Sequence, residues 1–245
     1  MKKSNLSKDV LAVIKPKIWD YYYYVSILTR KAYEKVIPGL LKENKNLKIL
    51  DYGCGVMPYK HLFEGYIGKY TGVDVGNNPK AEINIQSGET LPFMNDEFDI
   101  VLSSQVLEHV KDVEQYMNEC YRVLKNNGYL LLSTHGTWQY HASPYDYHRW
   151  TSIGLKNLLE IHNFEVEECT PILGQLALTS QLRINFYYSS AAFVGTAGKI
   201  LLAPVAMIYQ IKMMLEDLIT PKRVKQRDSA IFLMLAKKKS NLINE

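Results

Sequence analysis

The chain has 245 residues, of which 47% are apolar and 22% charged, and its mean hydropathy is −0.17. This length predicts one domain, or one domain with a large addition, and the composition excludes a disordered chain, a collagen and a polytopic membrane protein. The net charge of +4 is too small to indicate a partner that is a nucleic acid.

Three widely spaced cysteines fit neither a disulfide framework nor a zinc site, and they suit a reducing compartment. They are Cys54, Cys120 and Cys169. The N-terminus has two early lysines but no uninterrupted apolar stretch, so no secretory signal is expected. These features predict a cytoplasmic protein.

Residues 1–45 are expected to form a helical lid. Aromatic side chains that include Trp19, Tyr22 and Tyr33 recur there at helical spacing, and Pro38 with the following glycine breaks the pattern.

Short apolar strands then alternate with amphipathic helices. Strands are predicted at 47–53, 70–76, 81–85, 98–104, 128–134, 165–173 and 229–238. Helices are predicted in the segment that ends at Gly128 and after Thr151, which is expected to cap the second of them. This alternation predicts an α/β fold with a parallel sheet covered on both faces.

The last two strands are separated by an apolar insertion, residues 175–228, so the core would comprise 46–174 and 229–240. Two helices, at about 175–196 and 199–219, are expected in it. Three interpretations remain open: a packed cap or dimer element, a hairpin docked on a membrane, and a membrane span. Lys199, in the middle of the apolar stretch, argues against a span.

Positive charge gathers near the C-terminus. Residues 212–239 hold eight basic and three acidic residues, a balance of +5, while the rest of the chain is near neutral at −1. Such a tail is most often a solvated surface, and contact with a membrane surface or a partner is the alternative.

The strongest motif for chemistry follows the first predicted strand. Asp51, Gly53 and Gly55 form D-x-G-x-G, in which glycines allow a tight turn close to a ligand. Asp74 ends the next predicted strand, where an acid can hydrogen-bond the ribose of a nucleoside. An acid before the glycines, with no G-x-G-x-x-G continuation, argues against a nicotinamide-dependent oxidoreductase.

Five segments in this order resemble the class I S-adenosylmethionine-dependent methyltransferases, specifically the type 11 subgroup. They are LDYGCGVMPYKHLF, YTGVDVG, ETLPFMNDEFDIVLSSQVLEHV, CYRVLKNNGYLLLST and SPYDYHRWTSIGLKNLLE. The resemblance implies a Rossmann-like, seven-stranded, mostly parallel sheet with an antiparallel last strand and the insertion before that strand.

The resemblance also implies S-adenosyl-L-methionine as cofactor and a set of cofactor-binding positions. These are Asp51, Gly53, Cys54, Gly55, Asp74, Val75, Ser87, Gly88, Ser104 and Gln105. Ser87 stands where the family has an aspartate for the adenine amine, and Met57 stands where it has a third glycine.

Methyl transfer to an alcohol requires removal of a proton as well as positioning. The segment 134–151 follows the fifth predicted strand and is rich in titratable side chains. We expect a histidine base, with four catalytic candidates: His148, His109, His135 and Asp146.

The pattern P-x-D-x-x-R-x-T in that segment resembles methyltransferases encoded with bacterial surface-polysaccharide enzymes. Tyr145, Arg149 and Trp150 are the expected substrate-binding residues, because arginine and aromatic rings suit an anionic sugar. A structural pair between Asp146 and Arg149 is an equal alternative. The expected acceptor is a small-molecule or lipid-linked sugar, and with the latter the insertion and basic tail would bring the enzyme to the inner face of the membrane.

Two other functions remain open. Glu108 and His109 resemble part of the metal motif of ubiquinone-pathway methyltransferases, although Gln105 replaces its first glutamate and no metal ligand is assigned here. The chain could instead be a catalytically silent scaffold for a membrane or a partner, and a homodimer is possible in either case.

Overall fold

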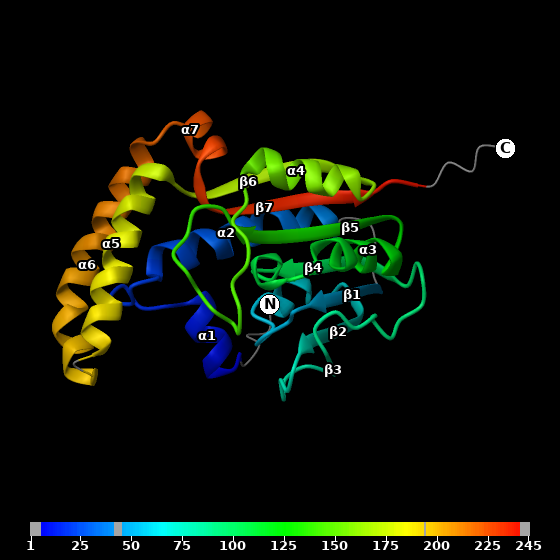
Figure 1. Cartoon of the computed structure of the whole chain (residues 1–245), viewed down its shortest axis with the longest axis horizontal. Helices are drawn as coiled ribbons and strands as arrows, with labels where there is room; N and C mark the ends of the chain where they lie inside the picture. Colours follow the sequence, from blue (N-terminus) through cyan, green and yellow to red (C-terminus); the bar gives the residue numbers. More distant parts are fainter. Residues whose placement is uncertain (1–5, 42–45, 194, 241–245) are drawn as a thin grey trace.

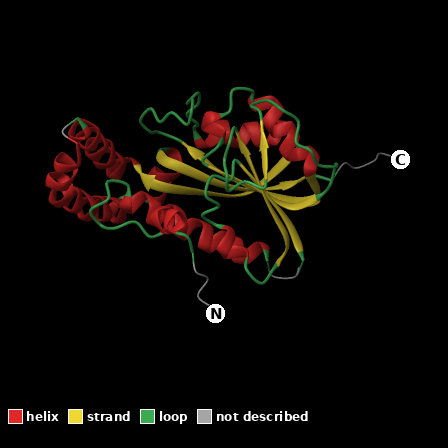
Figure 2. Ribbon diagram, turned by 90° about the horizontal axis from the view of Figure 1, so that it is seen from below, coloured by secondary structure: helices red, strands yellow, loops and turns green. Residues whose placement is uncertain are grey.

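The computed structural model describes residues 6–41, 46–193 and 195–240. A seven-stranded sheet in the order β3-β2-β1-β4-β5-β7-β6 forms its centre (Figures 1 and 2). The strands are β1 Leu47–Tyr52, β2 Ile67–Val75, β3 Ile83–Ile85, β4 Phe98–Ser104, β5 Leu124–His135, β6 Phe164–Gly174 and β7 Ser229–Lys238. All are parallel except β7, which runs antiparallel between β5 and β6. The predicted fold class and topology are confirmed.

Helices cover both faces of the sheet. Successive strand residues point to opposite faces, so neighbouring residues pack against different helices. Ile49 joins the cluster formed with α1 (Lys8–Ile14), α2 (Tyr23–Leu40) and the base of the insertion. Leu50, the next residue, joins the opposite cluster. That cluster is formed with α3 (Val113–Val123) and α4 (Ser152–Ile161). Both faces of the central strands are therefore buried.

The N-terminal segment differs from the prediction. Its described part is split in two because Lys15, which precedes Pro16, leaves the helical region with φ −134° and ends α1. Helix α2 continues through Pro38 to Leu40, where the sequence pattern predicted a break. Helix α2 packs on the sheet, and no residue of the described segment 6–41 lines the cavity described below.

The passage from α3 to β5 also lies elsewhere than predicted. The helix ends at Val123, and Leu124 already pairs with Phe98 of β4. Asn127 adopts φ +62°, a left-handed conformation that asparagine tolerates, where the strand register shifts. The strand thus begins four residues before Gly128. Thr151 caps α4 as predicted, its side chain accepting a hydrogen bond from the Gly154 amide.

The insertion forms two long helices, α5 (Gln175–Ala192) and α6 (Gly195–Ile219), followed by the short α7 (Lys222–Arg227). Figures 1 and 2 show α5 and α6 as a hairpin that projects from one end of the sheet. Buried Gln210 of α6 accepts a hydrogen bond from the Tyr24 amide and donates to two backbone carbonyls before α2. Polar contacts therefore fix the base of the hairpin to the core.

Candidate active site

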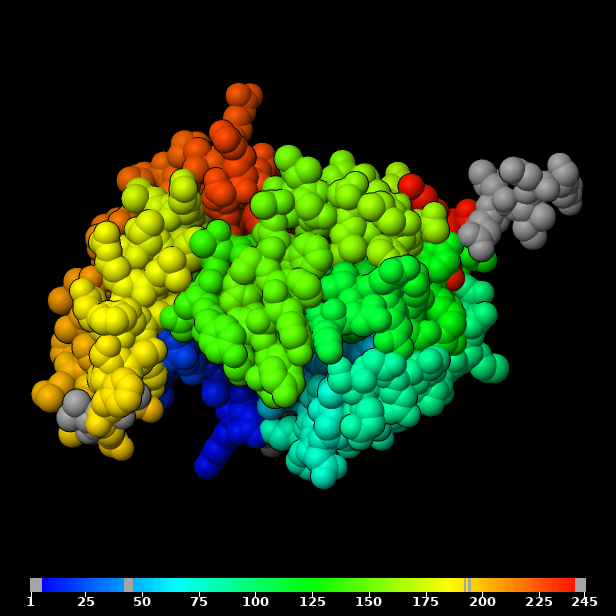
Figure 3. Space-filling model, viewed as in Figure 1, coloured from blue at the N-terminus to red at the C-terminus, as the bar shows by residue number. Residues whose placement is uncertain are grey.

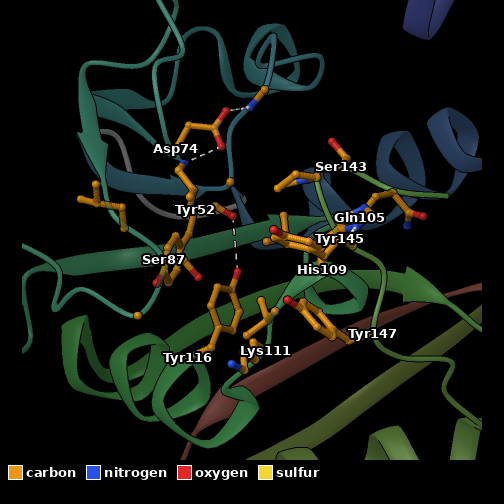
Figure 4. Close-up of a pocket in the computed structure, with 18 of the residues that line it drawn as sticks. Tyr52, Asp74, Ser87, Gln105, His109, Lys111, Tyr116, Ser143, Tyr145 and Tyr147 are labelled. Atoms are coloured by element: carbon orange, nitrogen blue, oxygen red, sulfur yellow. Dashed lines mark hydrogen bonds between the residues drawn. The ribbon is translucent and has the colours of Figure 1, made fainter.

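One large cavity, of about 1210 Å³, opens where the carboxyl ends of β1, β2 and β4 meet. Figure 3 shows the hollow between the teal segment after β2 and the green loop after β5. The strand ends supply one wall, and the segments 109–116 and 141–147 supply another (Figure 4). In open α/β sheets such a crevice is the usual position of a ligand.

The turn after β1 brings backbone to the cavity wall. Gly53 and Gly55 adopt φ +80° and +50°, which side chains other than glycine rarely adopt. A Cβ at Gly53 would lie 2.5 Å from a methyl group of Val106, whereas a Cβ at Gly55 would meet no protein atom within 4 Å. Gly55 lines the cavity, so the missing side chain leaves space for a ligand.

Asp74 lies at the end of β2 and faces the same turn (Figure 4). Its Oδ2 accepts hydrogen bonds from the Gly55 amide at 3.1 Å and the Asn78 side chain at 2.6 Å. Its Oδ1 accepts one, from the Val75 amide at 2.9 Å. A carboxylate oxygen can accept more than one hydrogen bond, so Oδ1 can also bind a hydroxyl group.

Asp51 lies behind the cavity. It is buried and does not line the cavity, and its Oδ2 accepts a 2.5 Å hydrogen bond from the Tyr70 hydroxyl. Burial raises the pKa of Asp51 to about 7, with the charges of Asp74 and Glu82 adding to the rise and the Tyr70 hydrogen bond opposing it. Asp51, predicted as a cofactor-binding residue, therefore does not form part of the cavity wall.

The remaining predicted cofactor positions all line the cavity. They are Cys54, Val75, Ser87, Gly88, Ser104 and Gln105. Gln105 adopts φ +56° at the end of β4, and its side chain donates a 2.8 Å hydrogen bond to Ser133 of β5. Met57, the residue in place of the family's third glycine, also has a positive φ, of +52°. The departure from glycine therefore leaves the backbone in a glycine-like conformation.

Of the four catalytic candidates, only His109 lines the cavity. Its Nδ1 lies 2.6 Å from the Tyr145 carbonyl oxygen. Because a carbonyl only accepts, Nδ1 carries the proton and Nε2 of the neutral ring keeps a free lone pair. This tautomer suits a general base.

His135 is buried at the end of β5, with Nδ1 2.9 Å from Oε1 of the buried Glu108. Burial alone would raise the pKa of Glu108, but its contacts with His135 and Thr134 hold the pKa below the usual value. His148 is half-buried and also lies outside the cavity lining. The amides of Tyr147 and His148 donate to the Glu108 carbonyl, so this region anchors the loop.

Asp146 and Arg149 form a bidentate pair with both contacts at 2.5 Å. The arginine also donates to the carbonyls of Trp138, Gln139 and His148, all within its own loop. Neither member of the pair lines the cavity, nor does Trp150. Tyr145, the third predicted substrate residue, does line it and is 62% exposed.

Three further residues line the cavity, and of these Lys111 alone was not considered from the sequence. Tyr147 and Lys111 line the wall opposite the glycine turn (Figure 4). His141 lines it too, and its pKa is lowered by burial and by the charges of His135 and His109. The many titratable side chains in the segment 134–151 indicated from the sequence that His141 and Tyr147 lie near the site. Lys111 is a lone lysine after the fourth strand, and no sequence pattern indicated that it would line the cavity.

The residues that resemble part of a metal motif, Gln105, Glu108 and His109, are not arranged around a common point. Glu108 is buried against His135, and Gln105 bonds Ser133. Throughout residues 6–41, 46–193 and 195–240, no group of three or more His, Cys, Asp or Glu side chains is placed to hold a metal ion.

The sheet order, the antiparallel β7 and a cavity beside a glycine turn define the Rossmann-like fold of class I methyltransferases. Residues 50–132 match the family model described as "Methyltransferase domain". This segment, which includes the glycine turn, is therefore similar to the class I methyltransferase domains of the type 11 group.

Two curated relatives match longer segments of the chain than the family model does. A "Probable S-adenosylmethionine-dependent methyltransferase" of Mycolicibacterium smegmatis is 26% identical over 55% of this chain and 65% of its own length. The "Ubiquinone biosynthesis O-methyltransferase" of Bartonella tribocorum is 33% identical over 42% of this chain and 47% of its own length. Less than two thirds of either relative is thus matched.

Solved structures agree with the fold. An S-adenosylmethionine-dependent methyltransferase from Mesorhizobium loti is 17% identical, with a TM-score of 0.53 over 86% of this chain and all of that chain. The phosphoethanolamine N-methyltransferase 2 of Haemonchus contortus, solved with S-adenosyl-L-methionine, is 15% identical. Its TM-score is 0.54 over 95% of this chain and 60% of that chain. At these identities the likeness concerns the fold alone.

Proposed function

We propose that the protein is an S-adenosylmethionine-dependent methyltransferase that methylates a sugar hydroxyl of a glycan or glycolipid precursor. The observation that carries the proposal is the placement of Asp74 and the Gly53–Gly55 turn on one wall of the cavity. A curated relative from Mycolicibacterium smegmatis bears the same general activity in its name.

The residues present fit the cofactor. The open space at Gly55 leaves room for a ligand against the backbone, and Asp74 Oδ1 has acceptor capacity for ribose hydroxyls. Ser87 and Gly88 would border the adenine. When bound, S-adenosylmethionine supplies a methyl group on a sulfonium sulfur, which is displaced in line by the acceptor.

On the acceptor side, the chain's own residues would orient a hydroxyl and take its proton. His109 would accept that proton at Nε2, since Tyr145 holds the other ring nitrogen protonated. Transfer of the proton to His109 would leave an imidazolium bonded to the Tyr145 carbonyl. In this proposal His109 is the base, while His135, His148 and Asp146 hold the loop around it.

The sugar acceptor is supported by the wall opposite the glycine turn. Tyr145 and Tyr147 place partly exposed rings there, 62% and 44% exposed, and such rings pack against sugar faces. Lys111 adds a cation that forms no ion pair with any described residue, so it can meet the phosphate of an activated or lipid-linked sugar. A cytoplasmic enzyme acting at the inner face of the membrane belongs to the same proposal.

The first test is the binding of S-adenosylhomocysteine measured by calorimetry. Wild type should bind with micromolar affinity. Asp74→Ala should bind at least about tenfold more weakly, because a tenfold change in Kd corresponds to about 1.4 kcal/mol, roughly the contribution of one good hydrogen bond. Glu167→Ala, which removes an exposed carboxylate from β6 outside the cavity, is the control and should bind like wild type.

Absence of binding by the wild type would favour the alternative of a silent scaffold. If the cofactor binds, the acceptor is sought by incubating the protein with sugar nucleotides and lipid-linked sugars and following methyl transfer. A metal-assisted reaction of a small molecule, the other alternative, would be indicated if a chelator abolished transfer and Mg²⁺ restored it.

A further inference from the structure

The outer face of α6 carries an unusual surface. Every residue from 200 to 219 that is exposed as a whole is apolar. The side chain of Lys212 is 44% exposed, and its ammonium is paired with Glu216 on the same helix. The residues are Ile200, Leu201, Pro204, Met207, Ile208, Ile211, Leu215, Leu218 and Ile219, which we call the α6 face. A solvent-facing helix normally shows charged residues on this side.

The α6 face is continuous along the helix. Residues 201, 204, 208, 211, 215 and 218 follow one another at alternating spacings of three and four, so they form one stripe. At a rise of 1.5 Å per residue the stripe is about 25 Å long. Leu201 near one end is 76% exposed and Leu218 near the other is 80% exposed. Apolar surface of this extent indicates an interaction surface.

The turn of the hairpin adds aromatic side chains. Phe193, between α5 and α6, is 95% exposed, and Phe186 near the end of α5 is 66% exposed. Large apolar rings at the end of a projecting hairpin are costly in water and favourable in the interfacial region of a bilayer.

Cations flank the α6 face at both ends. Lys222, Arg223 and Arg227 of α7 follow its C-terminal end, and none forms an ion pair with a described residue. Lys199 stands at the other end, with its ammonium 5.2 Å from the Tyr188 ring. Residues 175–228 hold seven basic and three acidic residues, and this balance of +4 equals the net charge of the whole chain.

These charges distinguish between the surfaces that could cover the stripe. A second copy of the chain would bring the same unpaired cations toward each other, because each copy contributes them at both ends of α6. An anionic lipid surface would take the apolar stripe and neutralise the cations together, and each basic residue near such a surface contributes about 1 kcal/mol.

A membrane span by α6 is a different case. By length and composition α6 could cross a membrane, and 22% of its most apolar window is buried in the protein. However, Gln210 and Asp217 on its inner side hydrogen-bond the folded core, at Tyr24 and Gly174 among others. Crossing would break these contacts, whereas lying flat on a surface keeps them.

We propose that the α6 face, with Phe193 and the cations of α7, docks the protein on the surface of an anionic membrane with α6 parallel to the bilayer plane. The proposal does not depend on methyl transfer. It gives the hairpin a purpose that the cavity does not supply, because none of the described residues between 175 and 228 lines the cavity.

The test is co-sedimentation of the full chain with phosphatidylcholine vesicles, with and without phosphatidylglycerol. Wild type should bind the anionic vesicles and release them at high salt. Leu201→Glu/Ile208→Glu should lower the partition coefficient at least about tenfold, since two apolar contacts are replaced by charges. The matched control is Ile153→Glu/Ile161→Glu on α4, at positions 80% and 67% exposed against 76% and 64%, and it should bind like wild type.

A second pair of variants tests the charge. Arg223→Gln/Arg227→Gln should weaken binding to anionic vesicles several-fold, while Lys31→Gln/Lys69→Gln, which removes two exposed lysines elsewhere, should not. Circular dichroism checks the fold of each variant. The proposal is overturned if wild type binds neither vesicle, or if the α6 variant binds as well as wild type. It is also overturned if light scattering shows a dimer that this variant makes monomeric while vesicle binding is unchanged or absent.

Discussion

The carboxylate of Asp51 accepts a 2.5 Å hydrogen bond from the Tyr70 hydroxyl, in the interior behind the glycine turn. Burial dominates the environment of this carboxyl and raises its pKa to about 7. Asp51 is thus a buried acid near Asp74 and Glu82 that does not itself line the cavity.

The raised pKa of Asp51 predicts an unusual pH dependence of stability. Between about pH 4 and pH 7 the unfolded chain ionises Asp51 while the folded protein keeps it protonated, so folding loses stability as the pH rises. Asp51→Asn keeps an acceptor for Tyr70 and removes this loss. Its free energy of unfolding relative to wild type should therefore rise across this window, by on the order of 3 kcal/mol.

Urea denaturation of both proteins at pH 4.5 and 7.5 measures this difference. Glu167→Gln, at an exposed carboxylate, shows the change expected from charge alone. A wild-type stability that rises between the two pH values relative to Asp51→Asn would contradict the assignment.

A second prediction concerns the two glycines of the turn. Gly53→Ala combines φ +80° with a Cβ 2.5 Å from Val106, and it should destabilise the protein by about 2 to 4 kcal/mol. Gly55→Ala has no steric conflict, so its folding cost should be about 1 kcal/mol. It should nevertheless weaken S-adenosylhomocysteine binding, because its methyl group would enter the cavity.

The double variant Gly53→Ala/Val106→Ala separates the two causes. It should recover part of the stability lost in Gly53→Ala, namely the part due to the clash, while the strain of the positive φ remains. Thermal unfolding measures this recovery, and a double variant no more stable than Gly53→Ala would rule out the clash.

A third prediction concerns the link between α2 and the site. The buried Tyr33 hydroxyl donates a 2.8 Å hydrogen bond to Ser133, whose hydroxyl also accepts from Gln105 of the cavity wall. Tyr33→Phe should cost about 1 kcal/mol of stability. A double-mutant cycle with Ser133→Ala should give a coupling energy above about 0.5 kcal/mol, and additive effects would show that the two side chains act independently.

The sequence allowed the strands of the sheet and the glycine turn to be predicted because these depend on local signals, whereas the antiparallel last strand was implied only by the family resemblance. Apolar strand runs and D-x-G-x-G are visible within a few residues. The loop 136–150 was harder, because its conformation depends on distant contacts such as the Tyr147 amide with the Glu108 carbonyl. The sequence pattern does not show that Arg149 donates its hydrogen bonds within its own loop, or that Lys111 lines the cavity.

The fourth prediction follows from that occupied arginine. Arg149→Lys cannot reproduce the bidentate contact with Asp146 or the donation to three carbonyls. The loop 136–150 should exchange its amide hydrogens faster and be cut sooner by protease, while S-adenosylhomocysteine binding should change by less than about twofold because the glycine-turn wall is untouched. A direct role in holding an anionic acceptor would instead raise the acceptor KM while loop exchange stayed as in wild type.

The last prediction concerns which of His109 and His148 acts as the base. If His109 is the base, His109→Ala should lower kcat for the acceptor by about 10²- to 10⁴-fold while S-adenosylhomocysteine affinity stays near that of wild type. His148→Ala is the matched control, since His148 lies in the same loop region but outside the cavity lining. It should keep most of the activity. The reverse result would move the base to His148, and equal activity in both variants would mean that the acceptor loses its proton without a histidine, as an acceptor that is already ionised would do.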